Sequence, residues 1–404
     1  MGEQTTTQDG DARRSGPLAG VRVVDLTAMV MGPYATQIMA DMGADVIKVE
    51  PPGGDDTRYI SVGPEHGLAG VFVNVNRGKR SIVLDLRSDA GRTALVELIK
   101  TADVFIHSMR AKAIAKLGFS YADVAAINPS VVYVNCYGYS RRGPDKDLPA
   151  YDDTMQAECG LVSVQQMLTG EPNFVGSIVA DKVTGLTAVY ATMMALFHRE
   201  RTGEGQEVEV SMFETMAAFV LVEHANGAMF DPPLGPAYYP RAVSPNRKPY
   251  RTKDGYIAAL IYNDRHWNAF VNAVKPAWVT DDMATLAQRA KRIDEVYAHL
   301  AETMAERTTE EWLVLFRELN VPAAPLRTPE DLLNNPHLDA VGFFETVDSP
   351  QGPVRFPGPP TWFSKTPAHV TGPTPLLGAD TETVLDELGL LPSKEKSSET
   401  DKSS

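Results

Sequence analysis

The chain has 404 residues, a formal net charge of −14 at pH 7 and 43% hydrophobic residues. Its length exceeds that of one ordinary domain, and its apolar content is that of a globular protein with a hydrophobic core. The acidic balance argues against nucleic acid or an anionic membrane as a general partner. Because the sequence contains no run of about 18 apolar residues, we expect no membrane-spanning helix.

The chain contains two cysteines, Cys136 and Cys159. They are too few for a disulfide framework and favour a reducing, cytoplasmic compartment. A structural zinc site needs about four nitrogen or sulfur ligands, and no spacing in the sequence supplies them, so we expect no metal. Residues 1–16 and 392–404 are polar, and we expect both termini to be disordered.

The first 160 residues alternate between strand-like and helix-like segments. The expected strands are residues 21–26, 44–52, 81–86, 103–108 and 130–139, and the expected helices are residues 31–43, 90–102 and 119–129. Strand–helix–strand units of this kind form a parallel sheet with right-handed crossovers. The pattern therefore predicts an α/β fold with a Rossmann-like half.

A Rossmann-like half raises the question of a nicotinamide cofactor. The turn after the first strand has one glycine, Gly32, and lacks the G-x-G-x-x-G pattern that lets the backbone approach a pyrophosphate. Glu50 ends the second strand, where an acid binds a ribose in such enzymes, but a single acid is weak evidence. The sequence therefore disfavours a dehydrogenase.

Residues 176–210 contain a long helical pattern that begins near Asp181 and is followed by a strand from Val208. Apolar side chains recur at helical spacing, so we expect one face of this helix to be buried. The residues of that face are Leu186, Val189, Tyr190, Met193 and Phe197. On these residues alone, the simplest role of Asp181 is that of a helix N-cap.

The middle of the chain differs in composition from the first half. Residues 231–251 are rich in Pro, Gly and Tyr and indicate a linker. An expected strand and several amphipathic helices follow, at residues 254–263, 265–274, 294–306 and 310–319. Short strands and a capped helix, expected at residues 343–350, 353–360 and 375–390, return to the first half. We therefore expect a large domain of residues 17–225 and 335–391 and a small α+β domain of residues 226–334.

Six sequence blocks carry a resemblance to a known family. They are GADVIKVEPPGGDDTR, NRGKRSIVLDLRS, AYDDTMQAECG, ADKVTG with ALFHRERTGEGQEVEVSM, DGYI with NDRHW, and PLLGADTETVL. In this order they resemble the family III CoA-transferases, which include formyl-CoA transferase and the carnitine CoA-transferase. The resemblance runs from about Gly16 to Leu391. It implies a Rossmann-like large domain, a smaller domain and a homodimer of two interlocked chains.

The resemblance implies that Asp181, in ADKVTG, is the catalytic nucleophile. Its carboxylate would attack an acyl-CoA, form an enzyme–acyl anhydride and then an aspartyl-CoA thioester, and pass CoA to an acceptor acid. Covalent intermediates of this kind divide one difficult exchange into easier steps. Coenzyme A is then a substrate, with no permanently bound cofactor. The family often has Gly before this Asp, where this chain has Ala180.

Tyr151 and Asp152 separate the transferases from their nearest competitor. The α-methylacyl-CoA racemases share the fold and many of the blocks, but a His stands where this chain has Tyr151. Proton abstraction beside a thioester carbonyl needs a base that titrates near neutrality. Tyr151 therefore favours a transferase, with an acyl-CoA racemase or isomerase as the alternative.

The resemblance also implies residues that bind CoA. They are Leu84, Arg87, Ser108, Met109, Arg110 and Lys116. CoA carries several phosphate charges, which basic side chains recognise. Ser108 and Met109 depart from the family pattern, in which Asn and an aromatic residue are common.

The acceptor site is less defined by sequence. Met29 and Val30 follow the first strand, where the formate enzyme has polar groups, and the glycine-rich lid of that enzyme is missing. We therefore expect an acceptor other than formate or oxalate. Arg241, Arg247 and Lys248 lie in the linker and are either carboxylate-binding residues or ordinary surface charges.

Overall fold

The computed structural model describes residues 15–391, so the expected disordered termini lie outside the described residues except for Ser15 and Gly16. Contacts divide the chain into two units. The described part of the first unit comprises residues 15–155, 178–216 and 340–391, and the second unit comprises residues 156–177 and 217–339. Residues 156–177, 217–225 and 335–339 group with the second unit, whereas the sequence leads us to expect them in the large domain.

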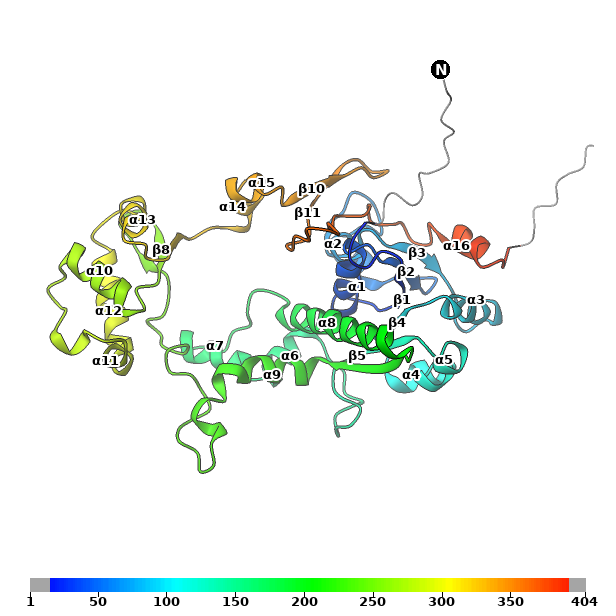
Figure 1. Cartoon of the computed structure of the whole chain (residues 1–404), viewed down its shortest axis with the longest axis horizontal. Coiled ribbons are helices and arrows are strands. Elements are labelled where there is room, and N and C mark those ends of the chain that lie inside the picture. Colours follow the sequence, from blue (N-terminus) through cyan, green and yellow to red (C-terminus); the bar gives the residue numbers. More distant parts are fainter. Residues whose placement is uncertain (1–14, 392–404) are drawn as a thin grey trace, which may run out of the picture. The chain divides into compact units, whose positions relative to one another are not determined.

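The first unit is built on a six-stranded parallel sheet (Figure 1). Its strands are β1 (Arg22–Leu26), β2 (Asp45–Glu50), β3 (Arg80–Val83), β4 (Val104–His107), β5 (Val132–Tyr137) and β6 (Gln206–Ser211). They are ordered β3-β2-β1-β4-β5-β6, and every neighbouring pair is parallel. This is the doubly wound Rossmann order, in which the strand order reverses between β1 and β4. The expected parallel sheet is confirmed.

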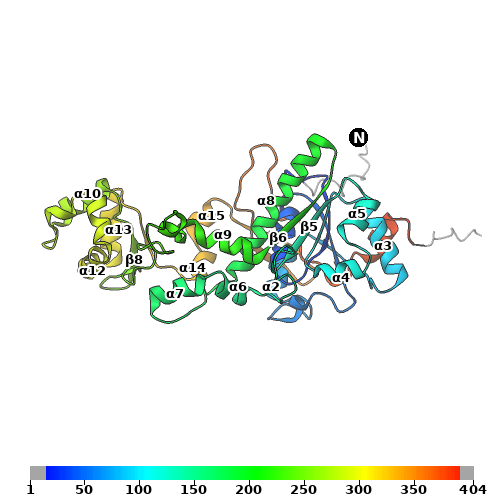
Figure 2. The ribbon, with the colours of Figure 1, turned by 90° about the horizontal axis from the view of Figure 1, so that it is seen from below.

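Helices cover both faces of this sheet. The main ones are α1 (Met31–Asp41), α3 (Asp89–Lys100), α4 (Ala111–Lys116), α5 (Tyr121–Ile127), α8 (Val179–Thr202) and α16 (Thr381–Glu387). Helix α1 packs against α8, and α3 packs against α5. Figure 2 shows α8 on one side of the sheet and α3, α4 and α5 on the other. Strands covered on both faces are mostly apolar, and every residue of β4 and β5 is buried.

Shorter elements complete the first unit. They are η1 (Asp56–Tyr59), α2 (Gly70–Asn76), and the antiparallel pair β10 (Phe344–Val347) and β11 (Val354–Pro357). Helix α16 packs back on the first half, because Val384 joins the hydrophobic core between the sheet and α3. Arg80 on β3 also forms a 2.6 Å ion pair with Glu387 of this helix.

Charged side chains are buried beneath the turn that joins β1 to α1. Lys79 pairs with Asp25 at 3.1 Å, and Lys48 pairs with Asp55 at 2.9 Å. Each ion is fully buried or nearly so, and isolated charges at this depth would cost several kcal/mol. Glu50 belongs to the same region and pairs with Arg58 at 2.6 Å, so its carboxylate is engaged within the protein.

The orientation of α8 differs from the sequence prediction. The exposed fractions of Leu186, Tyr190 and Phe197 are 49%, 52% and 64%, so the large apolar face is not covered by its own chain. The buried face consists mainly of small residues, namely Ala180, Thr184, Gly185, Ala188, Thr192, Ala195 and Leu196. Small side chains are needed there because α8 approaches α1 closely: a Cβ on Gly185 would lie 2.8 Å from the Met31 carbonyl oxygen.

The second unit contains a three-stranded antiparallel sheet, against which α12 and α13 pack, and several further helices. Its strands are β7 (Tyr250–Arg251), β8 (Tyr256–Ala259) and β9 (Ala323–Pro325), and its helices are α7 (Leu161–Thr169), η2 (Asn226–Met229), α10 (Asp264–Val274), η3 (Asp281–Met283), α11 (Leu286–Lys291), α12 (Ile293–Met304), α13 (Thr309–Glu318) and α14 (Pro329–Leu333). Trp267, Phe270, Trp312 and Phe316 form the centre of its core.

Three helices cross the boundaries between the units. They are α6 (Asp152–Glu158), α9 (Met212–His224) and α15 (Pro336–Ala340). Within residues 15–391, no helix combines the length and the apolar character that crossing a membrane requires.

Candidate active site

A cavity of about 340 Å³ lies at the carboxyl ends of the parallel strands of the first unit. Its lining comes from the segments that follow β1, β4, β5 and β6 and from the first turn of α8. The residues used below are Met29, Ser108, Arg110, Tyr137, Arg141, Lys146, Tyr151, Asp181 and Met212. The strand order reverses between β1 and β4, and ligands of open α/β sheets bind at such a switch point. We therefore treat this cavity as the candidate ligand-binding site of the first unit.

Asp181 enters the cavity from the first turn of α8. The helix begins at Val179, so Asp181 is its third residue and not its N-cap. Asp152 supplies the capping interaction instead: its Oδ1 accepts hydrogen bonds from the N–H groups of Ala180 and Asp181 at 2.7 and 3.1 Å. Two of the free donors at the helix start are thereby satisfied, and the backbone of Asp181 is fixed.

Burial and, to a smaller extent, the neighbouring Asp152 carboxylate together raise the pKa of the Asp181 carboxyl to about 7. A helix N-terminus by itself favours the ionised carboxylate, by roughly 0.3–1 kcal/mol. Burial and like charge outweigh this effect here. Asp181 thus combines a partly dry environment with a proton affinity far above that of an ordinary aspartate, which is typical of functional carboxylates.

The turn after β1 is held rigidly beside the cavity. The Ser108 Oγ accepts a 3.0 Å hydrogen bond from the N–H of Ala28, which bridges the β1 and β4 ends. Met29 has a φ of 66°, a left-handed conformation that is rare for a non-glycine residue and is often found at functional sites. Val30, the next residue, is buried and lines a different cavity of the first unit.

Basic residues give the cavity a positive wall. Arg110 follows β4, while Arg141 and Lys146 follow β5. Arg141 is anchored by ion pairs to Glu207 and Glu209 on β6, at 2.9 and 2.6 Å. The sequence reasoning found Arg110 but missed Arg141 and Lys146. Their position just beyond a predicted strand was the available signal, because the carboxyl ends of parallel strands meet at one edge.

The other expected CoA residues lie outside this cavity. Leu84 is buried in the core, and Met109 packs against the same core. Arg87 has an exposed side chain and a 3.0 Å ion pair with Asp85. Lys116 lines a second cavity of about 730 Å³ in the first unit, together with Arg92.

Comparisons with known proteins agree with this geometry. The model of the family described as CoA-transferase family III matches residues 18–381. The chain belongs to the family III CoA-transferases. It is 34% identical to the succinate–glutarate CoA-transferase of Agrobacterium fabrum, over 93% of this chain and 96% of that one. It is 31% identical to the succinyl-CoA:mesaconate CoA-transferase of Haloarcula hispanica, over 93% and 97%.

The fold is also that of a solved relative. A CAIB/BAIF family protein from Brucella suis superposes with a TM-score of 0.76 at 31% identity, covering 93% of this chain and 100% of that one. The mixed α/β architecture with its six-stranded parallel sheet thus matches that of this CAIB/BAIF family protein.

Tyr151 of this CoA-transferase lies at the cavity with its side chain largely exposed. It immediately precedes α6 and is not part of the buried core. Among the described residues that line the cavity, none is a histidine. His107 lies nearby on β4, but burial lowers its pKa to about 4, and its Nε2 is 3.0 Å from the Tyr133 hydroxyl.

Proposed function

We propose that this enzyme transfers CoA from an acyl-CoA donor to a carboxylic acid through covalent intermediates on Asp181. One observation carries the proposal: a single carboxylate of raised pKa projects into a cavity at the switch point of the sheet, with its backbone fixed by Asp152. The racemase alternative has no comparable support, because the cavity lining lacks a histidine that would titrate near neutrality.

The proposed reaction conserves the activated acyl bond at each step. The Asp181 carboxylate oxygen attacks the thioester carbonyl carbon, the C–S bond breaks, and CoA thiolate leaves an aspartyl–acyl anhydride. The thiolate then attacks the Asp181 carbonyl carbon and releases the donor acid, which leaves an aspartyl-CoA thioester. The acceptor carboxylate attacks this thioester, and the released thiolate attacks the acceptor side of the new anhydride. Acceptor acyl-CoA and the Asp181 carboxylate result, without net proton transfer.

The environment of Asp181 suits this role. A solvated carboxylate is a weak nucleophile, and a partly dry site removes hydration while the helix fixes the attacking geometry. A pKa near 7 makes the carboxylate more basic while leaving a large fraction ionised at neutral pH. We propose that Arg110, Ser108 and Lys146 bind CoA beside it.

One of the remaining expected CoA residues, Lys116, lines a second cavity of the first unit. Lys116 and Arg92 share the cavity of about 730 Å³ and would meet phosphate groups at the nucleotide end of CoA. Arg87, Leu84 and Met109 remain CoA-binding proposals that rest on the family resemblance alone.

The acceptor is proposed to be a carboxylic acid larger than formate. Relatives are named for the dicarboxylic acids succinate, glutarate and mesaconate, and we propose that this enzyme uses acids of that class. Both cysteines are free, and we propose a reducing, cytoplasmic location. We also propose the interlocked homodimer that the sequence resemblance implies.

Trapping the intermediate tests the proposed mechanism. Donor acyl-CoA added without acceptor is expected to give an adduct on the peptide that contains Asp181, and hydroxylamine is expected to convert it to a hydroxamate. Asp181→Asn is expected to give no adduct, whereas Asp153→Asn, at an exposed neighbouring acid, is the matched control and should react normally. An unmodified Asp181 during demonstrated turnover would refute the covalent route.

A further inference from the structure

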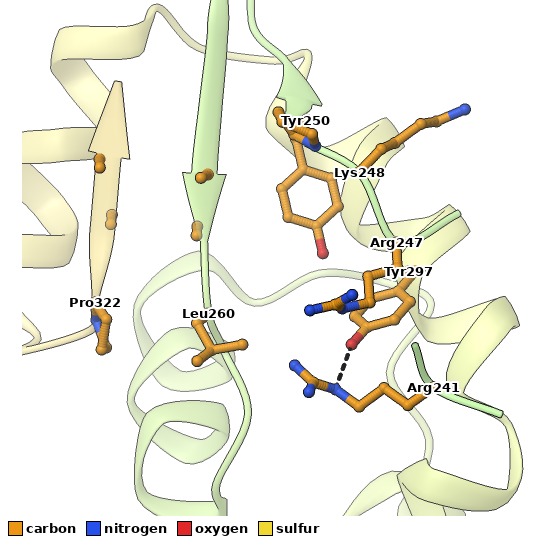
Figure 3. Close-up of a pocket in the computed structure, with 12 residues that line it drawn as sticks. Arg241, Arg247, Lys248, Tyr250, Leu260, Tyr297 and Pro322 are labelled. Carbon is orange, nitrogen blue, oxygen red and sulfur yellow. Dashed lines mark hydrogen bonds between the residues drawn. The ribbon is translucent and has the colours of Figure 1, made fainter. Parts of the chain in front are cut away.

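The second unit contains a cavity of about 590 Å³ that the mechanism above does not use (Figure 3). It lies between the segment before β7, strands β8 and β9, and helix α12. Arg241, Arg247, Tyr250 and Tyr297 form one wall. From the sequence, Arg241 and Arg247 are either ordinary surface charges or residues that bind a carboxylate. Their surroundings in the structure distinguish these two roles.

Arg241 is held in a fixed orientation. Its Nε donates a 2.9 Å hydrogen bond to the Tyr297 hydroxyl, and its guanidinium lies 4.6 Å from the centre of the Tyr262 ring. Both contacts leave the terminal nitrogens of the guanidinium facing the cavity (Figure 3). A preoriented guanidinium fork is the geometry that recognises a carboxylate through two hydrogen bonds.

Arg247 reaches the same place from an anchored loop. Asp294, on the first turn of α12, accepts hydrogen bonds from Ser244 and Asn246 at 2.7 and 3.0 Å and so fixes the loop that carries Arg247. In Figure 3 the guanidinium groups of Arg247 and Arg241 lie near each other beside Tyr297. Within residues 15–391, neither arginine forms an ion pair with a carboxylate.

The opposite wall of the cavity is apolar. It consists of Ala258, Ala259, Leu260, Pro322, Ala323 and Ala324 from β8, β9 and their flanking residues. Two uncompensated positive charges facing a hydrocarbon surface fit a ligand with two negative charges on a short methylene chain.

We propose that this pocket of the second unit is a binding site for a short dicarboxylate, distinct from the cavity that Asp181 lines. The arginines bind the carboxylates through charge-assisted hydrogen bonds, and the apolar wall contacts the methylene groups. Tyr297 is a positioning residue, since it acts by orienting Arg241. A monocarboxylate of the same length would leave one guanidinium without a partner and bind more weakly.

Calorimetric titration with glutarate and with valerate tests this proposal, because both acids have five carbons and differ by one carboxylate. Arg247→Gln is expected to weaken glutarate binding roughly tenfold or more, as loss of a charged hydrogen bond does. Lys248→Gln is the matched control: Lys248 is the next residue, but Figure 3 shows its ammonium pointing away from the arginines. Its effect is expected to be about twofold or less.

Tyr297→Phe provides a second variant that keeps both charges. It is expected to weaken glutarate binding by less than Arg247→Gln does, and to leave valerate binding unchanged. Thermal melting of each variant checks that it folds.

Several results would overturn the proposal. They are unchanged glutarate affinity in Arg247→Gln, equal loss of glutarate and valerate affinity, or competitive displacement of glutarate by 3′,5′-ADP, which would assign the pocket to CoA phosphates. The Asp181 adduct, measured with donor alone, reports separately on the proposed function. Absence of that adduct would refute the transferase mechanism while glutarate binding still decides the assignment of this pocket.

Discussion

Asp152 affects Asp181 in two separate ways, through hydrogen bonds and through its charge. Its carboxylate accepts hydrogen bonds from the backbone at the start of α8, which fixes Asp181 in place. The same negative charge raises the pKa of the Asp181 carboxyl, in addition to the larger effect of burial. The geometric role needs only an oxygen acceptor, whereas the electrostatic role needs the charge. An Asn at this position therefore separates the two roles.

The rate of adduct formation is expected to depend on pH through Asp181. The ionised carboxylate is the nucleophile, so the single-turnover rate with donor acyl-CoA should fall as the pH drops below about 7. Asp152→Asn should move this acid limb to lower pH, because the amide oxygen keeps the hydrogen bonds but removes the charge. Because only the donor is added, the titration of an acceptor acid does not affect the measured rate. A wild-type rate that stays constant down to pH 5 would contradict the assignment.

Asp181 is expected to lower the stability of the folded protein at neutral and alkaline pH. Its folded pKa is about 7 and its ordinary value is 3.8, so between these values the folded state binds a proton that the unfolded state does not. Stability therefore falls as pH rises through this window, and the full penalty is present above about pH 7. Because each pKa unit corresponds to about 1.4 kcal/mol, the penalty is on the order of 1–4 kcal/mol.

Asp181→Asn removes this penalty along with the nucleophile. Thermal melting should show the variant to be more stable than the wild type at pH 8, with the difference vanishing near pH 4. Other titrating groups, including Asp41, whose pKa burial raises to about 6, are common to both proteins and cancel in the comparison. A variant that is less stable at pH 8 would show that the carboxylate makes stabilising contacts instead.

At the scale of elements, the pairing of α1 with α8 determines where Asp181 lies. A methyl group at Gly185 would lie 2.8 Å from the Met31 carbonyl oxygen and 3.0 Å from Tyr34 Cδ1. Backbone atoms of a packed helix move little, so Gly185→Ala should force α8 away from α1. The expected cost is about 1–3 kcal/mol, the usual range for overpacking.

Because Gly185 lies one turn after Asp181, the same substitution should also slow formation of the Asp181 adduct. Urea unfolding and single-turnover rates measure the two effects. Glu200→Ala, at an exposed position near the end of α8, is the control and should change stability by about 0.5 kcal/mol or less. Equal stabilities of Gly185→Ala and the wild type would show that the two helices separate without cost.

The sequence predicted the strands and long helices of the first unit because their periodicity is strong. Expected segments 21–26 and 31–43, for example, appear as β1 and α1. The short helices α2, α6 and α7 were not predicted, since fewer than three turns carry little periodic signal. The longer α9 was also missed, because its apolar residues are spread around the helix and give little periodic contrast. The hydrophobic spacing correctly located an apolar face on α8. Spacing alone does not show what covers a face, and the prediction that this face is buried within the chain was wrong.

Only part of the candidate site could be predicted from the sequence. Asp181 and Tyr151 were singled out from sequence blocks, Met29 and Arg110 from their places after expected strands, and all four line one cavity. Met212 ends one of the six blocks but carried no expected role, whereas Arg141 and Lys146 lie outside the blocks. The sheet topology brings all three to the cavity. The sequence therefore identified reactive groups more readily than the walls around them.

At the scale of the whole molecule, the exposed apolar face of α8 indicates a protein–protein contact. We name the residues Leu186, Tyr190, Met194 and Phe197 the apolar stripe; they lie at helical spacing on the side opposite the small buried residues. The exposed fraction of each is between 49% and 67%. Contiguous exposed apolar surface of this kind typically marks a protein–protein contact.

The proposed occupant of the apolar stripe is a second copy of this chain, since the sequence resemblance implies an interlocked dimer. Two threaded chains separate only by unfolding, so the dimer should persist on dilution to nanomolar concentration, which sedimentation velocity measures. Met194→Glu should reduce the dimer fraction, because assembly would bury an unpaired charge, a change that costs several kcal/mol. His198→Glu places the same charge on α8 outside the stripe and should leave the dimer intact. A folded wild-type monomer at nanomolar concentration would refute the interlocked arrangement, and an unaffected Met194→Glu dimer would assign the stripe to a different partner.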